Sequence, residues 1–346
     1  MSLFSSSNNY IGVDIGTSSV KMVELGKKAN KIELITYGYS EGVREGFSDD
    51  WLKNPGYVAM VIDKIYRQMG GSAEKAVATL PAFSVFSSII NLHNVDKKSL
   101  AQAVEWEAKK FIPLPLEEMI LDWKIITSLS GKKEDTNVFL TGSPKKLVKK
   151  YVDIFRKTIV TLASLETETF SLIRSLLGDD KSTVMIVEIG AANADICVVK
   201  NGIPVVSRSL DMGGMGITKA IASALNIGTL RAEQFKRDLG VSANIAGSTV
   251  VPKTIAGSAG AIVEEVRYLI NVFQNKSEDK IEKVILSGGS AMLPNLAPFM
   301  SEKLNMNVVV GDPWARVFCQ PELKPILSEI GPSFSVAIGS ALRELE

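Results

Sequence analysis

Residues 13–21, with the sequence VDIGTSSVK, have a weaker echo at residues 187–195, VEIGAANAD. In each copy an apolar run reaches an acidic residue, turns through glycine and small residues, and resumes as apolar residues. This pattern predicts a strand, a tight turn and a second strand. Glycine allows such a turn to expose its backbone N–H groups, and small side chains let a phosphate approach them. Two such turns facing each other would hold a polyphosphate from both sides.

Neither turn matches the common phosphate-binding loops. The chain has no Gly-Lys-Ser/Thr sequence, and residues 20–25 continue as a strand pattern rather than as the start of a helix. A single Asp-x-Gly-Thr sequence is also typical of an ordinary β-turn. The duplication is therefore the informative feature, because two halves that open with the same hairpin predict an internally duplicated fold.

Composition excludes several classes of function. The 346 residues are 46% hydrophobic and 22% charged, which is typical of a globular protein with room for two domains. A formal charge of +1 gives no overall attraction to nucleic acid or to a membrane, so any polyanion site has to be local. One histidine, His93, and two distant cysteines, Cys197 and Cys319, cannot assemble a zinc site or a Ser-His-Asp triad. We therefore expect carboxylates, backbone dipoles and a hard cation to carry any catalysis, in a reducing, cytoplasmic setting.

The first half is expected to continue the hairpin as an antiparallel meander and then to admit an insertion. A third strand is predicted at residues 31–39, and a helix at residues 55–68. Residues 75–128 are interpreted as an inserted β-β-α-β unit, with strands at 75–80, 85–92 and 119–127 around a helix from Asp96 to Phe111. A strand at 137–142, a basic helix at 145–158, a strand at 160–165 and a helix at 167–177 follow. The basic helix is typical of a solvated face, and a membrane-facing or partner-facing role is the alternative.

The second half repeats the meander from residue 183 onward. Its strands are predicted at residues 184–187 and 196–210, the latter folded at the hairpin turn Asn201-Gly202. Buried strands are expected at 283–286 and 308–310, and helical segments at 217–225, 231–275, 296–304 and 335–345.

A nucleotide site in this arrangement requires three parts. Turn amides and small hydroxyls hold the phosphates, a carboxylate orients Mg²⁺ and its waters, and a glycine-rich strand-to-helix turn lets the nucleoside lie against the backbone. The third part can come from Gly288, Gly289 and Ser290. The first part, and some of the second, can come from Asp14, Gly16, Thr17, Ser18, Ser19 and Lys21.

These features resemble the actin-like ATPase superfamily. Residues 13–21 resemble its first phosphate motif, residues 187–195 its second, and residues 285–290, ILSGGS, its adenosine motif. Within the superfamily the match is to the PilM family of cytoplasmic type IV pilus assembly proteins and to the related FtsA proteins. That match depends on residues 11–25, 78–81 (ATLP), 105–118 (EWEAKKFIPLPLEE), 232–236 (AEQFK) and 334–343 (FSVAIGSALR).

The resemblance implies an α/β fold of the duplicated actin-like, ribonuclease-H-like kind, with two domains around a cleft that binds ATP and Mg²⁺. The first domain is expected at residues 9–180, with the inserted subdomain at 75–128. The second is expected at 181–332, with a helical subdomain at about 213–282. A C-terminal helix at 333–346 is expected to return to the first domain.

Particular residues follow from the motifs and the resemblance. Lys21 is expected to reach the β- and γ-phosphates, and Asp14 and Glu188 to bind magnesium. Glu233 and Lys236 are expected beside the ribose and adenine, with a solvent-facing Glu–Lys pair as the alternative. The full nucleotide-binding set is Asp14, Gly16, Thr17, Ser18, Ser19, Lys21, Glu188, Gly190, Ala191, Gly213, Gly214, Glu233, Lys236, Gly288, Gly289 and Ser290.

Two acidic residues are candidates for the catalytic position near the attacking water, namely Glu166 and Glu168. Either one could instead stabilise a helix N-terminus from its first turn. The second phosphate motif also departs from the family pattern, because Glu188 stands where Asp is usual and Asn193-Ala194 where Thr is usual. Displacement of a carboxylate by about an ångström can cost ~100-fold in rate, so we expect hydrolysis to be slow or absent while binding survives.

The function implied by the resemblance is that of an ATP-binding scaffold at the inner face of the cytoplasmic membrane. Its partner would be the short cytoplasmic N-terminal peptide of a PilN-like inner-membrane protein, with peripheral membrane association through that partner and no nucleic acid. Self-association stays open. The expected peptide groove is lined by Phe83, Val85, Phe86, Ile89, Ile90 and Phe111. The alternatives are an FtsA-like filament former of cell division and a small-molecule kinase on the same fold.

Overall fold

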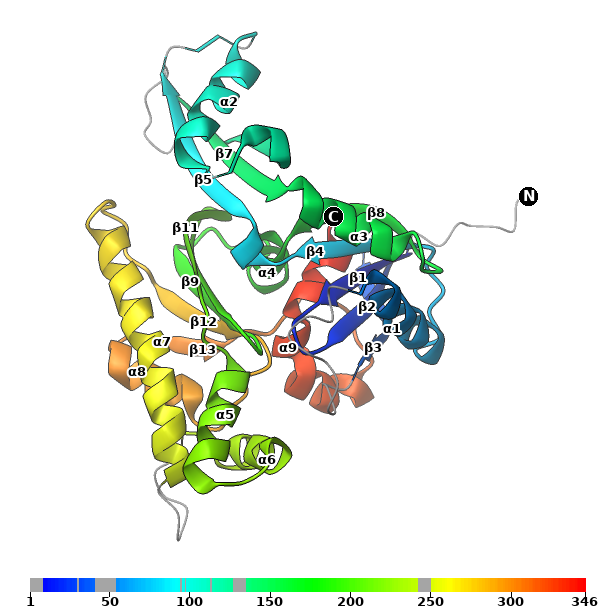
Figure 1. The fold of residues 1–346 in the computed structure, drawn as a ribbon, viewed down its shortest axis with the longest axis vertical. Helices are drawn as coiled ribbons and strands as arrows, with labels where there is room; N and C mark the ends of the chain where they lie inside the picture. The colour runs from blue at the N-terminus through cyan, green and yellow to red at the C-terminus, as the bar shows by residue number, and fades with distance from the viewer. Residues whose placement is uncertain are drawn as a thin grey trace.

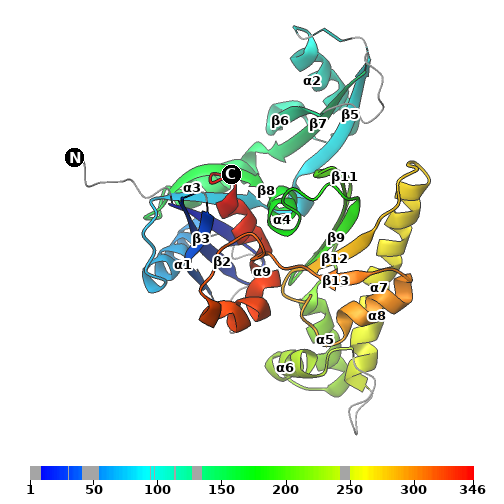
Figure 2. The same ribbon diagram turned by 180° about the vertical axis from the view of Figure 1, so that it is seen from behind.

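The computed structural model describes residues 9–29, 31–40, 54–93, 95–96, 98–112, 114–126, 135–241 and 250–346. Two five-stranded sheets stand side by side, and a small sheet projects from one end (Figures 1 and 2). The first sheet has the strand order β3-β2-β1-β4-β8. Its strands are β1 (Asn9–Ile15), β2 (Val20–Lys28), β3 (Lys31–Tyr39), β4 (Lys75–Leu80) and β8 (Thr161–Thr167).

The second sheet repeats the first strand for strand. Its order is β11-β10-β9-β12-β13, and in each sheet the opening strand pairs antiparallel with the next strand and parallel with the fourth. The strands are β9 (Val184–Ile189), β10 (Ala194–Lys200), β11 (Ile203–Leu210), β12 (Lys283–Ser287) and β13 (Val308–Val310). The internal duplication predicted from the paired turns is confirmed.

The small sheet has a different strand content from the expected inserted unit. Its order is β5-β7-β6, from β5 (Phe86–His93), β7 (Asp135–Pro144) and β6 (Met119–Ile126), and α2 (Leu100–Phe111) packs on one face. Strand β4, which the sequence analysis placed in the insertion, pairs with β1 and β8 in the first sheet instead. The correction has a physical reason: five of the six β4 residues are buried, as a strand inside a covered parallel sheet requires.

Helices cover the outer face of each large sheet. On the first sheet these are α1 (Pro55–Gln68) and α3 (Lys145–Phe155), which lie together on the same side in both views (Figures 1 and 2). Ile11, Val13 and Ile15 point toward them because alternate residues of a strand face opposite sides. The second sheet carries α5 (Gly214–Leu225), α6 (Thr229–Leu239), α7 (Val250–Gln274) and α8 (Leu296–Leu304).

Two helices fill the space between the sheets. Helix α4 (Glu168–Leu176) packs on the inner face of the second sheet, and α9 (Lys324–Leu342) packs on β1, β2 and α4. Helix α9 begins at Lys324 rather than at the expected residue 335, and Pro332 lies inside the helix. Glycines permit the close contacts: a Cβ on Gly12 would lie 1.8 Å from the carbonyl oxygen of Ala337, and one on Gly339 would lie 1.9 Å from that of Ser171.

Candidate functional site: the paired turns

The two turns between the opening strands have the same backbone geometry. In the first, the Gly16 N–H donates to the Ser19 carbonyl at 3.0 Å, and in the second the Gly190 N–H donates to the Asn193 carbonyl at 2.9 Å. A Cβ on either glycine would lie 3.2 Å from that same carbonyl oxygen, which favours a residue without a side chain. The sequence echo therefore reflects a structural one.

Strand alternation sends the charged residues of both hairpins toward the space between the sheets. Asp14 is on the same side of β1 as Gly12, which meets α9, and Glu188 is on the same side of β9 as Ile186, which packs with α4. The cross-strand partner of Asp14 is Lys21, and the partner of Glu188 is Asp195. One hairpin thus presents an opposite-charge pair and the other a like-charge pair.

The first pair is an ion pair, with Lys21 Nζ 3.1 Å from Asp14 Oδ2. Burial by itself would lower the pKa of the Lys21 ammonium, but Asp14, with smaller effects of Glu188 and Glu168, raises it above its ordinary value. Lys21 is therefore a permanent cation that faces carboxylates of both halves.

In the second pair, the pKa values of both carboxyl groups are raised, which favours their uncharged forms. Burial, together with Asp195 and Asp14, raises the pKa of Glu188 to about 8, and burial also raises the pKa of Asp195. Burial and the neighbouring carboxylates Asp14, Asp195 and Glu188 likewise raise the pKa of Glu168 well above its ordinary range, against the N–H bond that it accepts from Ala82 at 2.8 Å. The carboxylates outnumber the one lysine, so a divalent cation would relieve their repulsion.

The glycine-rich turn after β12 packs directly on the second hairpin. Gly288 has φ +85°, and a Cβ there would lie 2.5 Å from the Ile189 carbonyl oxygen and 2.7 Å from Glu188 Oε1. Its N–H donates to the Pro332 carbonyl of α9 at 2.9 Å, and the Ser290 N–H donates to Ile189 at 3.2 Å. The structure thus brings the predicted adenosine turn and the second phosphate turn together.

The start of α5 joins the same place. The N–H groups of Gly214 and Met215 donate to the carbonyls of Gly190 and Ala191 at 2.9 and 2.8 Å, and a Cβ on Gly214 would meet Ser290 Oγ at 2.4 Å. Gly213 is the N-cap residue of α5, and a Cβ there would lie 2.5 Å from the carbonyl oxygen of Ala191.

Lys236 reaches this helix from α6. Its buried Nζ donates to the Gly214 carbonyl and to Thr218 Oγ1, each at 3.0 Å, and lies 2.7 Å from Glu233 Oε2. The alternative of a solvent-facing Glu233–Lys236 pair therefore does not hold for Lys236.

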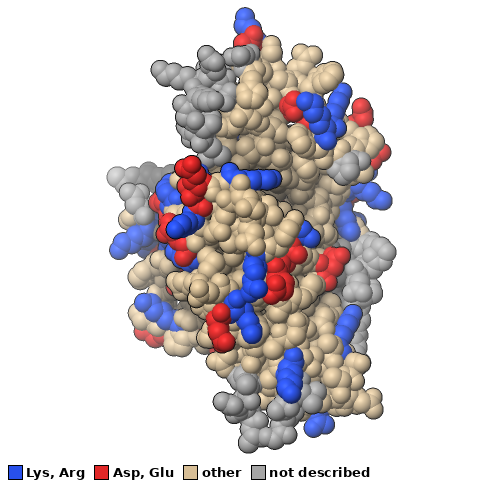
Figure 3. All heavy atoms as spheres, turned by 90° about the vertical axis from the view of Figure 1, so that its left-hand side faces the viewer, with Lys and Arg blue, Asp and Glu red and all other residues tan. Residues whose placement is uncertain are grey.

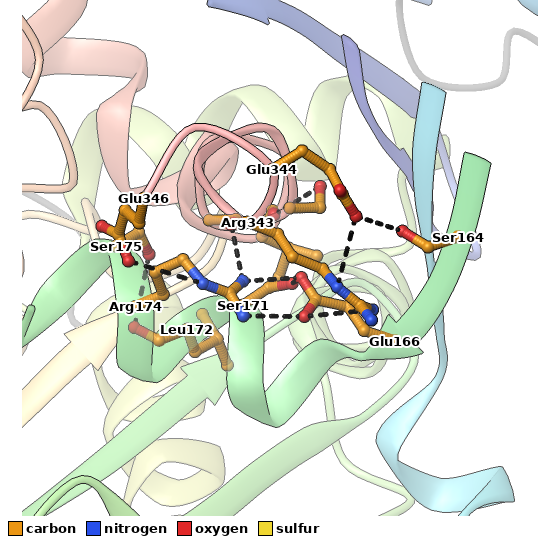
Figure 4. Close-up of polar contacts among 12 residues, drawn as sticks. Ser164, Glu166, Ser171, Leu172, Arg174, Ser175, Arg343, Glu344 and Glu346 are labelled. Atoms are coloured by element: carbon orange, nitrogen blue, oxygen red, sulfur yellow. Dashed lines mark hydrogen bonds and ion pairs between the residues drawn. The ribbon is translucent and has the colours of Figure 1, made fainter. Parts of the chain in front are cut away.

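Glu166 belongs to a different cluster (Figure 4). Its two oxygens take a bidentate bond from Arg174 at 2.7 and 2.9 Å, and Ser171 Oγ donates to it at 2.5 Å. Arg343, which directly follows α9, lies 3.8 Å from Glu166, and Arg174 also donates to the Gly339 carbonyl at 2.7 Å. This carboxylate joins β8, α4 and α9, so of the two catalytic candidates only Glu168 faces the paired turns.

The expected groove residues divide into two groups. Phe83 and Phe111 are half exposed, at 50% and 52%, and Ile89 is partly exposed. Ile90 is in the core of the small-sheet module, and Phe86 packs against that core. Val85, which is partly buried like Phe86 and Ile89, packs against the first-domain core, and the groove itself stays a prediction.

The acidic residues of the paired turns do not form a direct metal cage. Among the described residues, no group of three or more His, Cys, Asp or Glu is close enough to form a direct metal cage. Mg²⁺ typically keeps several waters and binds one or two carboxylates plus substrate phosphates. Asp14 and Glu188 could provide those carboxylates.

Two surface hollows of about 520 and 210 Å³ lie at the end of α8 and beside β3, and neither includes a residue of the paired turns.

Asp195 is the site residue that sequence reasoning missed. It occupies the position in the second copy that Lys21 occupies in the first, as the two cross-strand registers show. The sequence contained the signal. Aligning residues 13–21 with residues 187–195 matches Asp195 with Lys21, and the residue at this position lies across the hairpin from the acidic residue, here Glu188. Its Oδ1 accepts a hydrogen bond from Ser209 Oγ.

The raised pKa of Glu188 leads to a prediction for Glu188→Gln. Between the ordinary value of 4.5 and about 8, the folded protein keeps a proton that the unfolded chain releases, so wild-type stability falls as pH rises through this window. Glutamine removes this effect. We expect the variant to be about 1–3 kcal/mol more stable than wild type at pH 8 and to show a flatter pH profile. Urea unfolding at pH 5.5 and 8, with Glu302→Gln on the exposed surface as the control, checks this; parallel profiles for all three proteins would contradict it.

Comparison with known proteins identifies the class of the fold first. The structure is similar to that of the ethanolamine utilization protein EutJ from Carboxydothermus hydrogenoformans, with a TM-score of 0.58, 15% identity, and 96% of this chain and 89% of that chain covered. It is also similar to MreB5 of Spiroplasma citri bound to AMPPNP, with a TM-score of 0.54, 14% identity, and coverage of 96% and 94%. The chain therefore has the duplicated actin-like ATPase fold.

The family follows from the sequence match. The family model of the type IV pilus assembly protein PilM matches residues 12–345, so this chain belongs to the PilM family. A solved PilM-PilN type IV pilus biogenesis complex contains a chain similar to it, with a TM-score of 0.85, 25% identity, and 97% of this chain and 98% of that chain covered. The cell division protein FtsA of Bacillus subtilis is 22% identical over 348 residues, which span 88% of this chain and 78% of FtsA.

No helix in the described part of the chain is both long and apolar enough to cross a membrane.

Proposed function

We propose that this protein is an ATP-binding scaffold of the type IV pilus inner-membrane platform that docks the N-terminal cytoplasmic peptide of a PilN-like protein. The observation that carries the nucleotide part is the pair of matched turns, whose acidic residues and Lys21 converge between the two sheets. The solved structures of MreB5 with AMPPNP and with ADP support it, because this protein of the same fold binds a nucleotide in both.

Each part of the site has a role in this proposal. Gly16 and Gly190 shape the two turns, and the amides and hydroxyls of residues 17–19 and the amide of Ala191 hold the phosphates. Lys21 moves from Asp14 to the β- and γ-phosphates. Asp14 and Glu188 orient the waters of Mg²⁺. The turn at residues 288–290 supports the nucleoside, with Lys236 and Glu233 beside it, and the cation supplies positive charge next to the phosphates.

Hydrolysis is expected to be slow or absent, well below the ~10 s⁻¹ median of enzymes. The longer Glu188 side chain is packed against Gly288, and a displaced carboxylate costs rate. Glu188→Asp should therefore raise phosphate release at least severalfold, measured by a coupled phosphate assay, with Glu302→Asp as the control. Fast release by the unchanged protein would contradict the expectation.

The partner part of the proposal is supported by the likeness to a chain of the PilM-PilN complex and by exposed aromatic side chains. Strands β5 and β6 form the edges of the three-stranded sheet, and an extended peptide can add its backbone to such an edge while apolar side chains fill adjacent pockets. Phe83, which precedes β5, and Phe111, which ends α2, are exposed near the small sheet. Docking there would place the protein at the inner face of the cytoplasmic membrane.

Fluorescence anisotropy with the N-terminal cytoplasmic peptide of a PilN-like protein from the same organism tests the docking. We expect saturable binding, and we expect Phe83→Ser combined with Phe111→Ser to weaken it about tenfold or more, because exposed aromatic anchors carry much of the energy of such interfaces. Leu230→Ser is the control, since Leu230 is an even more exposed apolar residue, on α6. Equal affinity of wild type and the double variant would place the peptide elsewhere.

A further inference from the structure

We propose that the outward face of α1 and α3 docks on an anionic phospholipid bilayer. This surface, here called the basic face, is formed by the exposed residues of segments 54–68 and 145–159. The two helices lie side by side against the first sheet and present their other sides to solvent (Figures 1 and 2). The choice of a bilayer as the occupant rests on the proposed function above.

The basic face concentrates positive charge in a chain that is nearly neutral as a whole. These two segments contain only two acidic residues, Asp63 and Asp153. Asp63 accepts the Ile159 N–H at 2.9 Å, and Asp153 lies 3.5 Å from Arg156. The two carboxylates offset two of the eight basic residues and leave a formal charge of +6 on the segments. The eight basic residues are Lys64, Arg67, Lys145, Lys146, Lys149, Lys150, Arg156 and Lys157. With a formal charge of +1 overall, the rest of the chain carries more acidic than basic residues.

Exposed apolar side chains lie among these cations. Met60 is 57% exposed and Ile159 is 49% exposed. The hydrogen bond from Ile159 to Asp63 holds the end of the α3 segment against the middle of α1, close to Met60 and Lys64 in the chain. A surface of lysines with interspersed apolar residues is suited to the interface of a bilayer, where ammonium groups meet lipid phosphates and apolar groups enter the acyl boundary.

The face that carries α7 is charged differently. Figure 3 shows the face that carries α7, where lysine and arginine side chains are interspersed with acidic ones. Arg208 lies 2.8 Å from Glu265 there, and Arg267 lies 3.3 Å from Glu264. Such pairs cancel locally, so that face offers little net attraction to an anionic surface.

The position of the basic face also favours a bilayer. Helix α3 begins at Lys145, directly after Pro144 ends β7, the central strand of the small sheet. A peptide docked beside that sheet and attached to a transmembrane helix would hold the basic face near the lipid headgroups. Each lysine contributes weakly, but tethering raises the local concentration of lipid and lets the weak contacts add.

Vesicle cosedimentation tests this inference. We expect the full-length protein to bind vesicles of phosphatidylcholine that contain roughly one third phosphatidylglycerol, and not vesicles of phosphatidylcholine alone, because anionic headgroups attract surface lysines. Lys146→Glu with Lys149→Glu should reduce binding about tenfold or more, and salt at about 0.5 M should abolish it. Lys276→Glu with Lys280→Glu is the control, because these exposed lysines change the net charge equally from the other domain.

The outcomes separate this inference from the proposed function. Equal loss in both double variants, or no binding of wild type to anionic vesicles while the peptide still binds in solution, would overturn the bilayer and leave the peptide docking in place. Vesicle binding that depends on Lys146 and Lys149 without any peptide binding would support the basic face and overturn the docking. Thermal melts check that both double variants remain folded.

Discussion

Gly339→Ala is expected to destabilise the protein by about 4 kcal/mol or more, which is at the exceptional end for a single substitution. Gly339 lies where α9 crosses α4, and an added Cβ would be 1.9 Å from the carbonyl oxygen of Ser171 and 2.5 Å from its carbonyl carbon. Both are backbone atoms, so no side chain can rotate away. The helices would have to separate, and the buried contacts between the two large sheets would be lost with them.

Urea unfolding followed by circular dichroism measures this effect. The matched control is Gly260→Ala in α7, where an added Cβ has nothing within 4 Å and alanine should stabilise the helix by about 0.5–1 kcal/mol. The two substitutions make the same chemical change in a helix and differ only in their surroundings. Similar stabilities for the two variants would show that α4 and α9 do not approach as closely as the structure indicates.

Asp14→Ala is expected to weaken the binding of MgATP at least ~100-fold while leaving metal-free ATP nearly unaffected. A carboxylate has no hydrogen to donate to a phosphate, so Asp14 can favour the nucleotide only through the cation and its waters. Its removal also frees Lys21, now 3.1 Å from Asp14 Oδ2, to contact a phosphate directly. Metal-free ATP should therefore bind as well as before or slightly better.

Titration calorimetry with and without magnesium separates the two affinities. Asp122→Ala is the control, because Asp122 is an exposed carboxylate on β6 in the small sheet. Equal weakening of MgATP and ATP by Asp14→Ala would make Asp14 a structural residue of the turn.

Much of the fold could be predicted because its strands and helices have clear periodicity. The helices at Pro55–Gln68 and Leu296–Leu304 and the strand at Val308–Val310 have the predicted bounds. The sheet to which β4 belongs could not be predicted. Two short apolar strands that follow each other closely have the same sequence pattern whether they pair with each other or belong to different sheets. The start of α9 differs from the predicted residue 335 because the helix continues through Pro332, a residue that more often ends or begins a helix than lies inside one.

The site shows a similar division. The duplicated turns and the adenosine turn could be found from glycine spacing, and the structure brings Gly190, Gly214 and Gly288 together. The choice between Glu166 and Glu168 could not be made, because the chain changes from strand to helix between them and their directions depend on that transition. Only the partners decide it: Glu166 meets Arg174, and Glu168 meets the charges of the paired turns.

The binding of MgATP to the wild-type protein, freed of endogenous nucleotide, tests the account most directly. The matched turns predict saturable heat for one nucleotide per chain in isothermal titration calorimetry. They also predict a higher melting temperature, since a ligand at ~100 times its Kd stabilises the folded state by about 2.7 kcal/mol. No heat and no change of melting temperature at millimolar MgATP would contradict the central claim that the paired turns form a nucleotide site.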